Sequence, residues 1–279
     1  MEHSVVDGAG TLYIVSTPIG NLGDLSARAI ETLRSADAVL AEDTRHSRAL
    51  LAHFDIHTPL ESYHEHNEAA STPRLVERLQ GGATLALVSD AGTPLLSDPG
   101  ARLVRAAAEA GVRVVPIPGA SALLSALVGA AISADRFTFF GFPPRKGPER
   151  RALMAEVAAL RHTAVLYEAP SRAADTLADL AAAGAGARDA VMARELTKQF
   201  EEFCRGTVES LAAQFAKQAP RGEVVLVIAG GEAPVLDESA LKERAARLRA
   251  DGLSARDVVR VLMDEDGAPR NLAYRLAHD

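Results

Sequence analysis

The sequence has little of what disulfide-stabilised, cysteine-metal or membrane-spanning proteins need. Its 279 residues contain one cysteine, Cys204, and no tryptophan. One cysteine forms no internal disulfide and builds no cysteine-ligated metal site, and no partner histidine is identifiable near it, so we interpret Cys204 as structural. No apolar run approaches the length of a membrane span, and the first ten residues lack the basic-then-apolar order of a signal peptide. We therefore expect a cytoplasmic protein.

An excess of positive charge is also missing. The chain has 30 Lys and Arg against 37 Asp and Glu, a net charge of −7. This balance argues against a protein that coats nucleic acid through bulk electrostatics. The densest basic stretch is "PPRKGPERR", in which Arg145, Lys146, Arg150 and Arg151 surround Glu149. It is either a local basic patch or an ordinary solvated turn and helix start.

Two nucleotide-binding fingerprints are absent as well. The stretch "GNLG" at 20–23 lacks the three spaced glycines of a dinucleotide-binding loop, and no Gly-Lys-Ser/Thr occurs. An NAD enzyme and a P-loop NTPase are therefore poor fits. The sequence support for a metal centre is equally weak. The stretch "YHEHNE" supplies His64, His66, Glu65 and Glu68, but no further cluster completes a ligand set. We predict no metal.

Strand-like and helical segments alternate along the first half of the chain. Apolar, β-rich runs occupy 11–16, 37–42, 84–89 and 113–119. Helical periodicity follows in 26–36, 44–54 and 100–111. This alternation predicts an α/β domain with a mostly parallel sheet. The rigid "PIPGAS" at 116–121 closes it, so we place the first domain at 1–118.

The second half predicts a mixed sheet and then a helical extension. Five strand-like runs occupy 136–142, 163–169, 189–196, 200–206 and 222–230. The short gap "TKQ" between the third and fourth runs predicts a hairpin. We place a mixed-sheet α/β domain at 119–232. The charged, helical remainder forms an extension at 233–279, with Ser254 as an N-cap and Pro269 in a helix first turn.

The unusual loops of the first half all follow strands. They are "TPIGNLGD", "AEDTR", "SDAGTPLLSDPG" and "PIPGAS". In an open parallel sheet, ligands bind beyond the carboxyl ends of the strands. Gly20, Gly23 and Gly92 permit positive φ and close approach of main chain to a ligand, while the prolines hold the loops in shape. Each loop alone could be ordinary turn chemistry, but their coincidence on four strands predicts a ligand site.

Seven segments occur in the order seen in the tetrapyrrole-methylase-like superfamily, and the chain resembles that family from about residue 11 to 230. They are "LYIVSTPIGNLGDLSARAIETLRSADAVLAEDTR", "LVSDAGTPLLSDPG", "PIPGASA", "GFPPRKGPER", "LYEAPSR", "RELTKQFEE" and "GEVVLVI". The resemblance implies a class III methyltransferase of two α/β domains, with S-adenosylmethionine in the cleft between them, and a homodimer. It is strongest to members that methylate a cytidine 2′-hydroxyl in the decoding region of 16S rRNA, within the small ribosomal subunit.

The resemblance also assigns cofactor positions by motif. In the loops of the first domain and the start of the second they are Pro18, Ile19, Ser89, Asp90, Ala91, Gly92, Thr93, Pro94, Ser121 and Ala122. Further along the second domain they are Glu168 in "YEAP" and Leu196 in "RELT".

Methyl transfer to a ribose hydroxyl needs alignment of the reactants and a group that handles the hydroxyl proton or the developing charge. The catalytic candidates are Glu195, His64 and Lys146. Contact with the RNA is predicted for Arg45, Asn67, Lys146, Arg172 and Lys198. Each of these residues could instead belong to a surface ion pair or a structural pair.

Two other functions stay open. A methylase of a small tetrapyrrole would also need cations, for the substrate carboxylates. However, "TPIGNLGD" and "SDAGTP" depart from the Gly-Pro-Gly-Asp and Gly-Asp-Pro forms that we associate with those enzymes. A non-catalytic ribosome-assembly factor could retain the same fold. The tail resembles a helix-turn-helix in its spacing, so its arginines could meet RNA, but its many acids fit a solvated helical bundle equally well.

Overall fold

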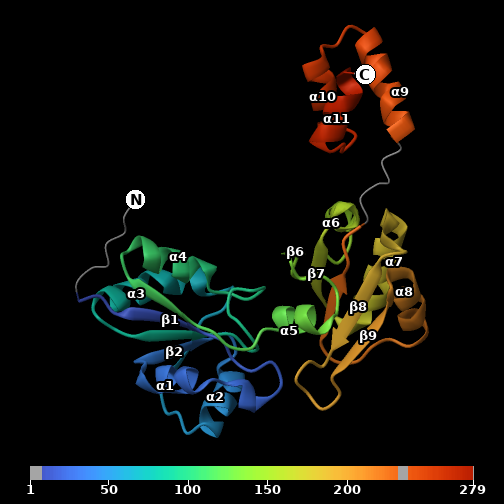
Figure 1. Ribbon diagram of the computed structural model, residues 1–279. Coiled ribbons are helices and arrows are strands. Elements are labelled where there is room, and N and C mark those ends of the chain that lie inside the picture. Colours follow the sequence, from blue (N-terminus) through green and yellow to red (C-terminus); the bar gives the residue numbers. More distant parts are fainter. Residues whose placement is uncertain (1–7, 232–237, 279) are drawn as a thin grey trace. The chain divides into compact units, whose positions relative to one another are not determined.

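The computed structural model in Figure 1 describes residues 8–231 and 238–278. By its contacts the chain separates into one unit that ends at Gly230 and a second that begins at Gly231. The first unit carries two five-stranded sheets, one before residue 118 and one after it. This is the α/β architecture predicted from the sequence. The domain limits at 118 and 232 stay predictions.

The first sheet is parallel throughout, as the alternation of strands and helices predicts. Its strand order is β3-β2-β4-β1-β5. The strands are β1 (Thr11–Val15), β2 (Ala38–Ala41), β3 (Leu60–Ser62), β4 (Leu85–Val88) and β5 (Arg113–Ile117). Every residue of β2 and β4 is buried, as expected of central strands covered on both faces. The carboxyl ends of all five strands therefore lie along one edge of the sheet.

Four helices cover the two faces of this sheet. They are α1 (Ala27–Ser35), α2 (Thr44–His53), α3 (Glu68–Gln80) and α4 (Ala101–Glu109). Figure 1 shows α3 and α4 on one face and α1 and α2 on the other. Leu79 and Leu103 pack on the first face, and Leu33 and Leu51 on the second. Alternation of side chains along the strands supplies both cores.

The second sheet is mixed, and its order is β6-β7-β10-β8-β9. Its strands are β6 (Phe137–Phe139), β7 (Thr163–Glu168), β8 (Asp189–Arg194), β9 (Glu202–Thr207) and β10 (Val224–Ile228). The β6–β7 pair is parallel, and the other three pairs are antiparallel. The β8–β9 pair is the predicted hairpin, joined by residues 195–201.

Helices also sandwich the second sheet. One core contains side chains from α6 (Pro148–Ala159), α7 (Ala173–Leu180) and α8 (Val208–Lys217). The other contains side chains from α5 (Ala122–Gly129), together with Ile19 of the first loop. Shorter helical turns are Leu22–Asp24, Pro170–Arg172 and Ala181–Ala185.

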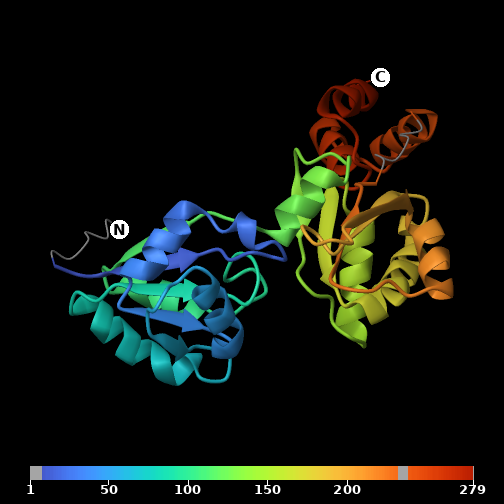
Figure 2. The ribbon, with the colours of Figure 1, turned by 90° about the horizontal axis from the view of Figure 1, so that it is seen from below.

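The second unit is the predicted helical extension. Figure 2 shows the helices of its described part, α9 (Glu238–Ala250), α10 (Ala255–Asp264) and α11 (Arg270–His278). They share a core of their own. Ser254 caps α10 by accepting the Asp257 N–H at 3.2 Å. None of the helices in the described ranges 8–231 and 238–278 is long and apolar enough to cross a bilayer.

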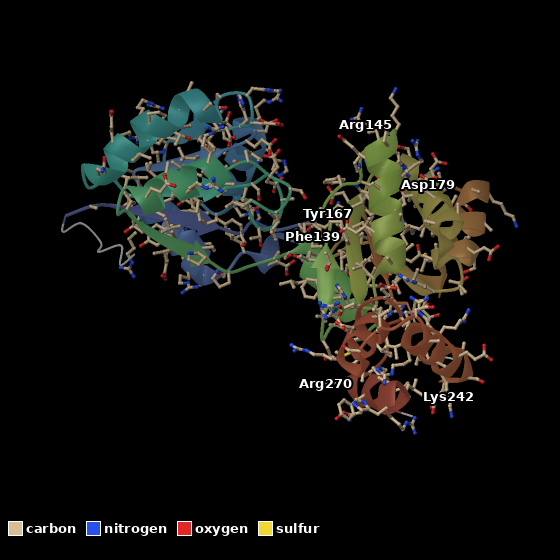
Figure 3. All side chains as sticks on the ribbon, turned by 90° about the horizontal axis from the view of Figure 1, so that it is seen from above. Phe139, Arg145, Tyr167, Asp179, Lys242 and Arg270 are labelled. Atoms are coloured by element: carbon tan, nitrogen blue, oxygen red, sulfur yellow. The ribbon has the colours of Figure 1, made fainter. Side chains whose placement is uncertain are left out.

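The basic stretch around residue 148 exposes less positive charge than its sequence indicates, because one of its four cationic side chains is buried. Arg150 is 8 % exposed. Its guanidinium donates to Asp179 Oδ2 at 2.6 Å, to Thr176 Oγ1 at 3.0 Å and to the Pro144 carbonyl at 3.1 Å. The helical spacing of α6 places Arg150 toward α7, whereas Arg145 lies at the outer end of α6 (Figure 3). Arg150 is thus a structural residue.

Candidate functional site

Three of the four strand-end loops are joined to one another by hydrogen bonds. Thr17 and Gly92 exchange backbone N–H···O bonds of 2.9 and 3.1 Å. The hydroxyls of Ser16 and Thr93 lie 3.0 Å apart. Thr93 Oγ1 also donates to the carbonyl of Ala120 at 3.1 Å. The loops after β1, β4 and β5 therefore form one assembly at the edge where the strands end.

The fourth loop joins the assembly through a carboxylate. Asp90 Oδ1 accepts the Asp43 N–H at 3.1 Å, which ties the loop after β4 to the start of α2. Asp43 itself caps α2 by accepting the Arg45 N–H at 2.8 Å. All four predicted loops thus meet in one place.

Of the three loop glycines singled out in the sequence, Gly92 has a positive φ, +81°. A Cβ on Gly92 would stand 3.2 Å from Ile19 Cγ2 and 3.7 Å from the Ala120 carbonyl oxygen. Gly20 and Gly23 have ordinary φ values, so that part of the prediction is wrong for them. Gly20 is instead a point of close approach, because its Cα faces the stem of Lys198.

A cavity of about 370 Å³, called the cofactor cavity below, opens among these loops and the ends of β7 and β10. This volume lies in the usual range of small-molecule sites, about 300–1,000 Å³. The predicted residues that line it are Ile19, Asp90, Ala91, Gly92, Thr93, Ala122 and Glu168. The sequence reasoning missed its other lining residues, which include Glu42, Asp98, Phe142, Tyr167 and Glu223. Asp98 belongs to the second Ser-Asp pair of "SDAGTPLLSDPG", which was the available signal.

The remaining predicted cofactor residues lie behind or beside this lining. Ser89 Oγ donates to the Gly92 carbonyl at 3.1 Å, and Ser121 caps α5 by accepting the Leu124 N–H at 3.4 Å. Leu196 packs in the core that also contains Ile19. Pro94 is buried, and Pro18 lines a neighbouring cavity. Contact of these five residues with a cofactor stays a prediction.

Five carboxylates line the cofactor cavity, and the three without a described ion pair, Glu42, Asp90 and Asp98, give it an acidic character. Burial, followed by the negative charges of Glu42 and Asp90, raises the pKa of Asp98 to about 6. Burial and the charge of Asp90 also raise the pKa of Glu42 above its ordinary value. Carboxylates that repel one another in a partly buried site gain from a positive charge placed among them. The cavity therefore fits a ligand with a cationic centre.

An aromatic wall closes the second-sheet side of the cavity. The rings of Tyr167 and Phe139 are in edge contact with centroids 4.8 Å apart, and Phe142 lies 5.5 Å from Tyr167. Figure 3 shows Phe139 and Tyr167 beside each other on this sheet. The Tyr167 hydroxyl accepts the Leu123 N–H at 3.1 Å, and burial raises its pKa. This wall offers apolar contact area to a planar group.

Glu168 holds the turn after β7. Its fully buried carboxylate accepts hydrogen bonds from the Ala169 N–H at 2.8 Å, Thr176 Oγ1 at 2.6 Å and Arg172 Nε at 2.8 Å. Arg172, predicted to contact RNA, is therefore paired inside the protein, with a quarter of its side chain exposed. Thr176 in turn accepts from Arg150, which links Glu168 to α6.

Glu195 and Lys198 lie together at the β8–β9 turn. Lys198 Nζ donates to Glu195 Oε1 and to Glu223 Oε2, both at 3.1 Å. The Glu223 N–H donates to the same Glu195 oxygen at 3.2 Å. These contacts, with the Lys198 hydrogen bond the strongest, hold the pKa of Glu195 below its ordinary value. Glu195 is therefore a carboxylate engaged by its neighbours.

The other predicted residues are more dispersed, and His64 and Lys146 are absent from the described lining of the cofactor cavity. His64 Nδ1 is buried without a described partner. Asn67 holds the turn before α3, accepting the His64 N–H at 2.9 Å and donating to the Ser62 carbonyl at 3.0 Å. Arg45 pairs with Asp43 at 2.8 Å and is 86 % exposed. Lys146 is exposed. Their roles stay predictions.

The described residues contain no group of three or more His, Cys, Asp or Glu side chains placed to hold a metal ion.

Comparison with known proteins gives concordant matches. The model of the tetrapyrrole (corrin/porphyrin) methylases matches residues 11–212. The chain is 46 % identical over 271 residues to the ribosomal RNA small subunit methyltransferase I of Synechocystis sp., covering 96 % of this chain and 97 % of that protein. It is 45 % identical over 273 residues to the protein of that name from Pseudomonas aeruginosa, with the same coverage.

Solved structures share the fold at low sequence identity. Uroporphyrin-III C-methyltransferase from Thermus thermophilus, complexed with S-adenosyl homocysteine, gives a TM-score of 0.56 at 19 % identity, covering 79 % of this chain and 97 % of that one. Diphthine synthase gives 0.60 at 17 % identity, covering 84 % and 95 %. With the family model across most of the chain and near-full-length relatives above 40 % identity, the chain belongs to the tetrapyrrole methylase family, in its ribosomal RNA small subunit methyltransferase I group.

Proposed function

We propose that this chain transfers a methyl group from S-adenosylmethionine to the 2′-hydroxyl of a cytidine in the decoding region of 16S rRNA. One observation carries the proposal. Four loops of the first sheet and the ends of two strands of the second sheet converge on one cavity lined by five carboxylates. The names of the relatives, ribosomal RNA small subunit methyltransferase I, support the substrate.

The residues of the cofactor cavity fit S-adenosylmethionine. The bound cofactor supplies a methyl group on a positively charged sulfur. Asp90, Asp98 and Glu42 offset that charge, and Tyr167 and Phe142 give apolar contact to a nucleoside ring. Gly92 lets the main chain approach closely, since no side chain projects from it.

The RNA side of the proposal rests on local contacts. A chain with a net charge of −7 does not attract RNA over its whole surface. The predicted RNA-contacting residues are Arg45, Asn67, Lys146, Arg172 and Lys198. An rRNA site folded in an assembled subunit is recognised by shape and a few contacts, so a limited number of cations suffices.

The test is methylation with the purified protein, methyl-labelled S-adenosylmethionine and small ribosomal subunits that lack the modification. We expect label in 16S rRNA and a 2′-O-methylcytidine in the decoding-region fragment by nucleoside mass mapping. Label in uroporphyrinogen or a precorrin instead would make the chain a tetrapyrrole methylase. Binding to subunits without methyl transfer would make it an assembly factor.

We also propose that the protein is a homodimer, as the family resemblance implies. Sedimentation equilibrium of the full chain is expected to give twice the 29.4 kDa chain mass, and a monomer at micromolar concentration contradicts it.

A further inference from the structure

A second cavity adjoins the cofactor cavity. It has a volume of about 450 Å³ and lies among the first loop, α2 and the β8–β9 turn; we call it the α2 cavity. Four residues line both cavities: Ile19, Asp90, Ala91 and Glu223. A ligand in the α2 cavity is therefore the immediate neighbour of a ligand in the cofactor cavity.

One face of α2 forms a wall of this cavity. His46, Ala49, Leu50 and His53 line it, and their spacing of three, four and seven residues places them on one side of the helix. The first loop adds apolar atoms, including those of Leu22. Apolar and imidazole surfaces of this kind accept an unstacked nucleobase, because every base has a flat face that can stack on them.

Lys198 is the cation of the α2 cavity. Its stem crosses Gly20 so closely that a Cβ there would collide with it. Its Nζ is held by Glu195 and Glu223. Burial alone would lower the pKa of Lys198, but the two carboxylates outweigh burial and raise it above the ordinary value. Lys198 is therefore a fixed ammonium donor and not a proton acceptor.

The turn that carries Lys198 is strained in a way that fixes its position. Glu195 and Thr197 have φ values of +49° and +65°, in the left-handed region that non-glycine residues rarely adopt. Gly222, with φ +82°, leaves the space that the Glu195 carboxylate fills. Strain of this kind persists where the surroundings over-determine a geometry, and it clusters at functional sites.

We propose that the α2 cavity receives the nucleotide that is methylated, unstacked from its RNA neighbours, and that Lys198 donates a hydrogen bond to its 2′ oxygen. This inference rests on the proposed function and names the acceptor half of the same site. Extrusion of a nucleotide is the usual way for an enzyme to reach an atom inside structured nucleic acid.

The step balances with groups that line the two cavities. The ribose oxygen bonds to the methyl carbon as the carbon–sulfur bond breaks, and the electron pair of that bond stays on the sulfur. The hydroxyl proton passes to the imidazole of His46, which stands in the first turn of α2 and lines the α2 cavity together with Lys198. Lys198 stabilises the negative charge that develops on the oxygen. Glu195 is a positioning residue that acts through Lys198.

Filling the α2 cavity tests the assignment directly. Ala49 lines this cavity and not the cofactor cavity. We expect Ala49→Trp to lower the methylation rate of small subunits by more than about 100-fold, while its affinity for S-adenosylmethionine by calorimetry stays within twofold. Ala52→Trp, an exposed position of α2 outside both linings, is the matched control and keeps the wild-type rate. An active Ala49→Trp variant overturns the assignment.

Lys198 is tested by charge removal. Loss of one donor to a developing oxyanion costs about 10²–10³ in kcat, so Lys198→Met is expected to lower kcat by that factor without weakening cofactor binding. Lys217→Met, at an exposed position of α8, is the control. Glu195→Gln is expected to lower kcat about tenfold with the KM for subunits unchanged, as a positioning role requires. A wild-type kcat for Lys198→Met overturns its role.

His46 is tested by pH at saturating cofactor. The single-turnover rate of the wild type should rise with pH as an imidazole loses its proton, and His46→Asn should abolish that rise. The other charged and titratable groups that line the cavity with His46 are Asp90, Lys198, Glu223 and His53, so His53→Asn is measured alongside and exposed His57→Asn is the control. A preserved rise in His46→Asn overturns the proton assignment. If the wild type methylates no RNA, the proposed function fails; if it does and the variants match it, this inference alone fails.

Discussion

The ends of the two sheets build the site with different materials. At the first sheet, loops are joined mainly by backbone groups and small hydroxyls: Thr17 with Gly92, and Ser16 with Thr93. At the second sheet, a glutamate at the end of a strand holds the following turn in two places. Glu168 accepts a backbone N–H and binds Arg172; Glu195 accepts a backbone N–H and binds Lys198.

The two sheet ends are therefore vulnerable to different changes. A backbone-built loop depends on residues whose φ or size permits the turn, so it is broken by adding a side chain. A carboxylate-built turn depends on paired charge, so it is broken by removing one partner. The largest effect is expected where the paired charge is most buried, because an orphaned buried group loses its compensation.

Glu168→Ala should give the largest change, in stability. It leaves Arg172 unpaired and the Ala169 N–H and Thr176 hydroxyl without their acceptor. Loss of one partner of a buried pair costs about 3–5 kcal/mol; Arg172 keeps some solvent contact, so we expect about 3 kcal/mol in the free energy of unfolding by urea denaturation. Exposed Glu156→Ala on α6 is the control, with a change within about 0.5 kcal/mol. Equal stability of the two variants would remove the contrast between the sheets.

Gly92→Val should have the next largest effect, on cofactor binding. The φ of +81° disfavours a β-branched residue, and its Cβ would press on Ile19. A cost of about 1–3 kcal/mol in the binding-competent loop corresponds to roughly a 5- to 150-fold loss of affinity for S-adenosylmethionine by calorimetry. Gly252→Ala is the matched control, because Gly252 also has a positive φ, +90°, but stands in open space in the helical unit. An unchanged affinity of Gly92→Val would remove this loop from the site.

The smallest expected effect is the pH dependence set by Asp98. Its pKa of about 6 lies above the ordinary value, so the folded protein holds a proton there between about pH 4 and 6 that the unfolded chain has released. The stability contribution of Asp98 therefore falls as pH rises through that window and is flat above it. A sulfonium favours the charged carboxylate, so cofactor binding displaces the proton.

The affinity for S-adenosylmethionine relative to uncharged S-adenosyl homocysteine should therefore rise roughly three- to tenfold from pH 5 to 7. Calorimetry at several pH values measures the ratio. Asp98→Asn should flatten it. A ratio independent of pH in the wild type would mean that the cationic centre lies away from Asp98.

Much of the fold follows from local patterns, and the failures have physical causes. The parallel order of the first sheet follows from strands that alternate with amphipathic helices. The mixed second sheet and the β8–β9 hairpin follow from a short gap in the sequence. Strand β3 was not predicted, because its three residues of mixed polarity, Leu60–Ser62, show no strand pattern and join the edge of the sheet through backbone hydrogen bonds. α3 contains Pro73, which obscures a helix in the sequence.

The site was predictable where its residues sit in loops after strands and harder where packing decides. Ile19, Gly92 and Glu168 line the cofactor cavity as their motifs suggest. Arg150 shows what the sequence does not reveal. Nothing in a run of four basic residues indicates that the side chain of one of them is buried against Thr176 and Asp179. Cavities lined by distant segments, such as that between α2 and Lys198, need the three-dimensional structure.

The reciprocal bonds between Thr17 and Gly92 carry one more consequence. They close a two-residue clasp between loops 75 positions apart in the chain, and both of its hydrogen bonds join backbone groups of the protein itself. Binding energy is therefore not consumed in ordering these loops. The loops around the cofactor cavity are therefore expected to be ordered before S-adenosylmethionine binds. Hydrogen exchange at the Thr17 and Gly92 amides should then be slow in the ligand-free protein.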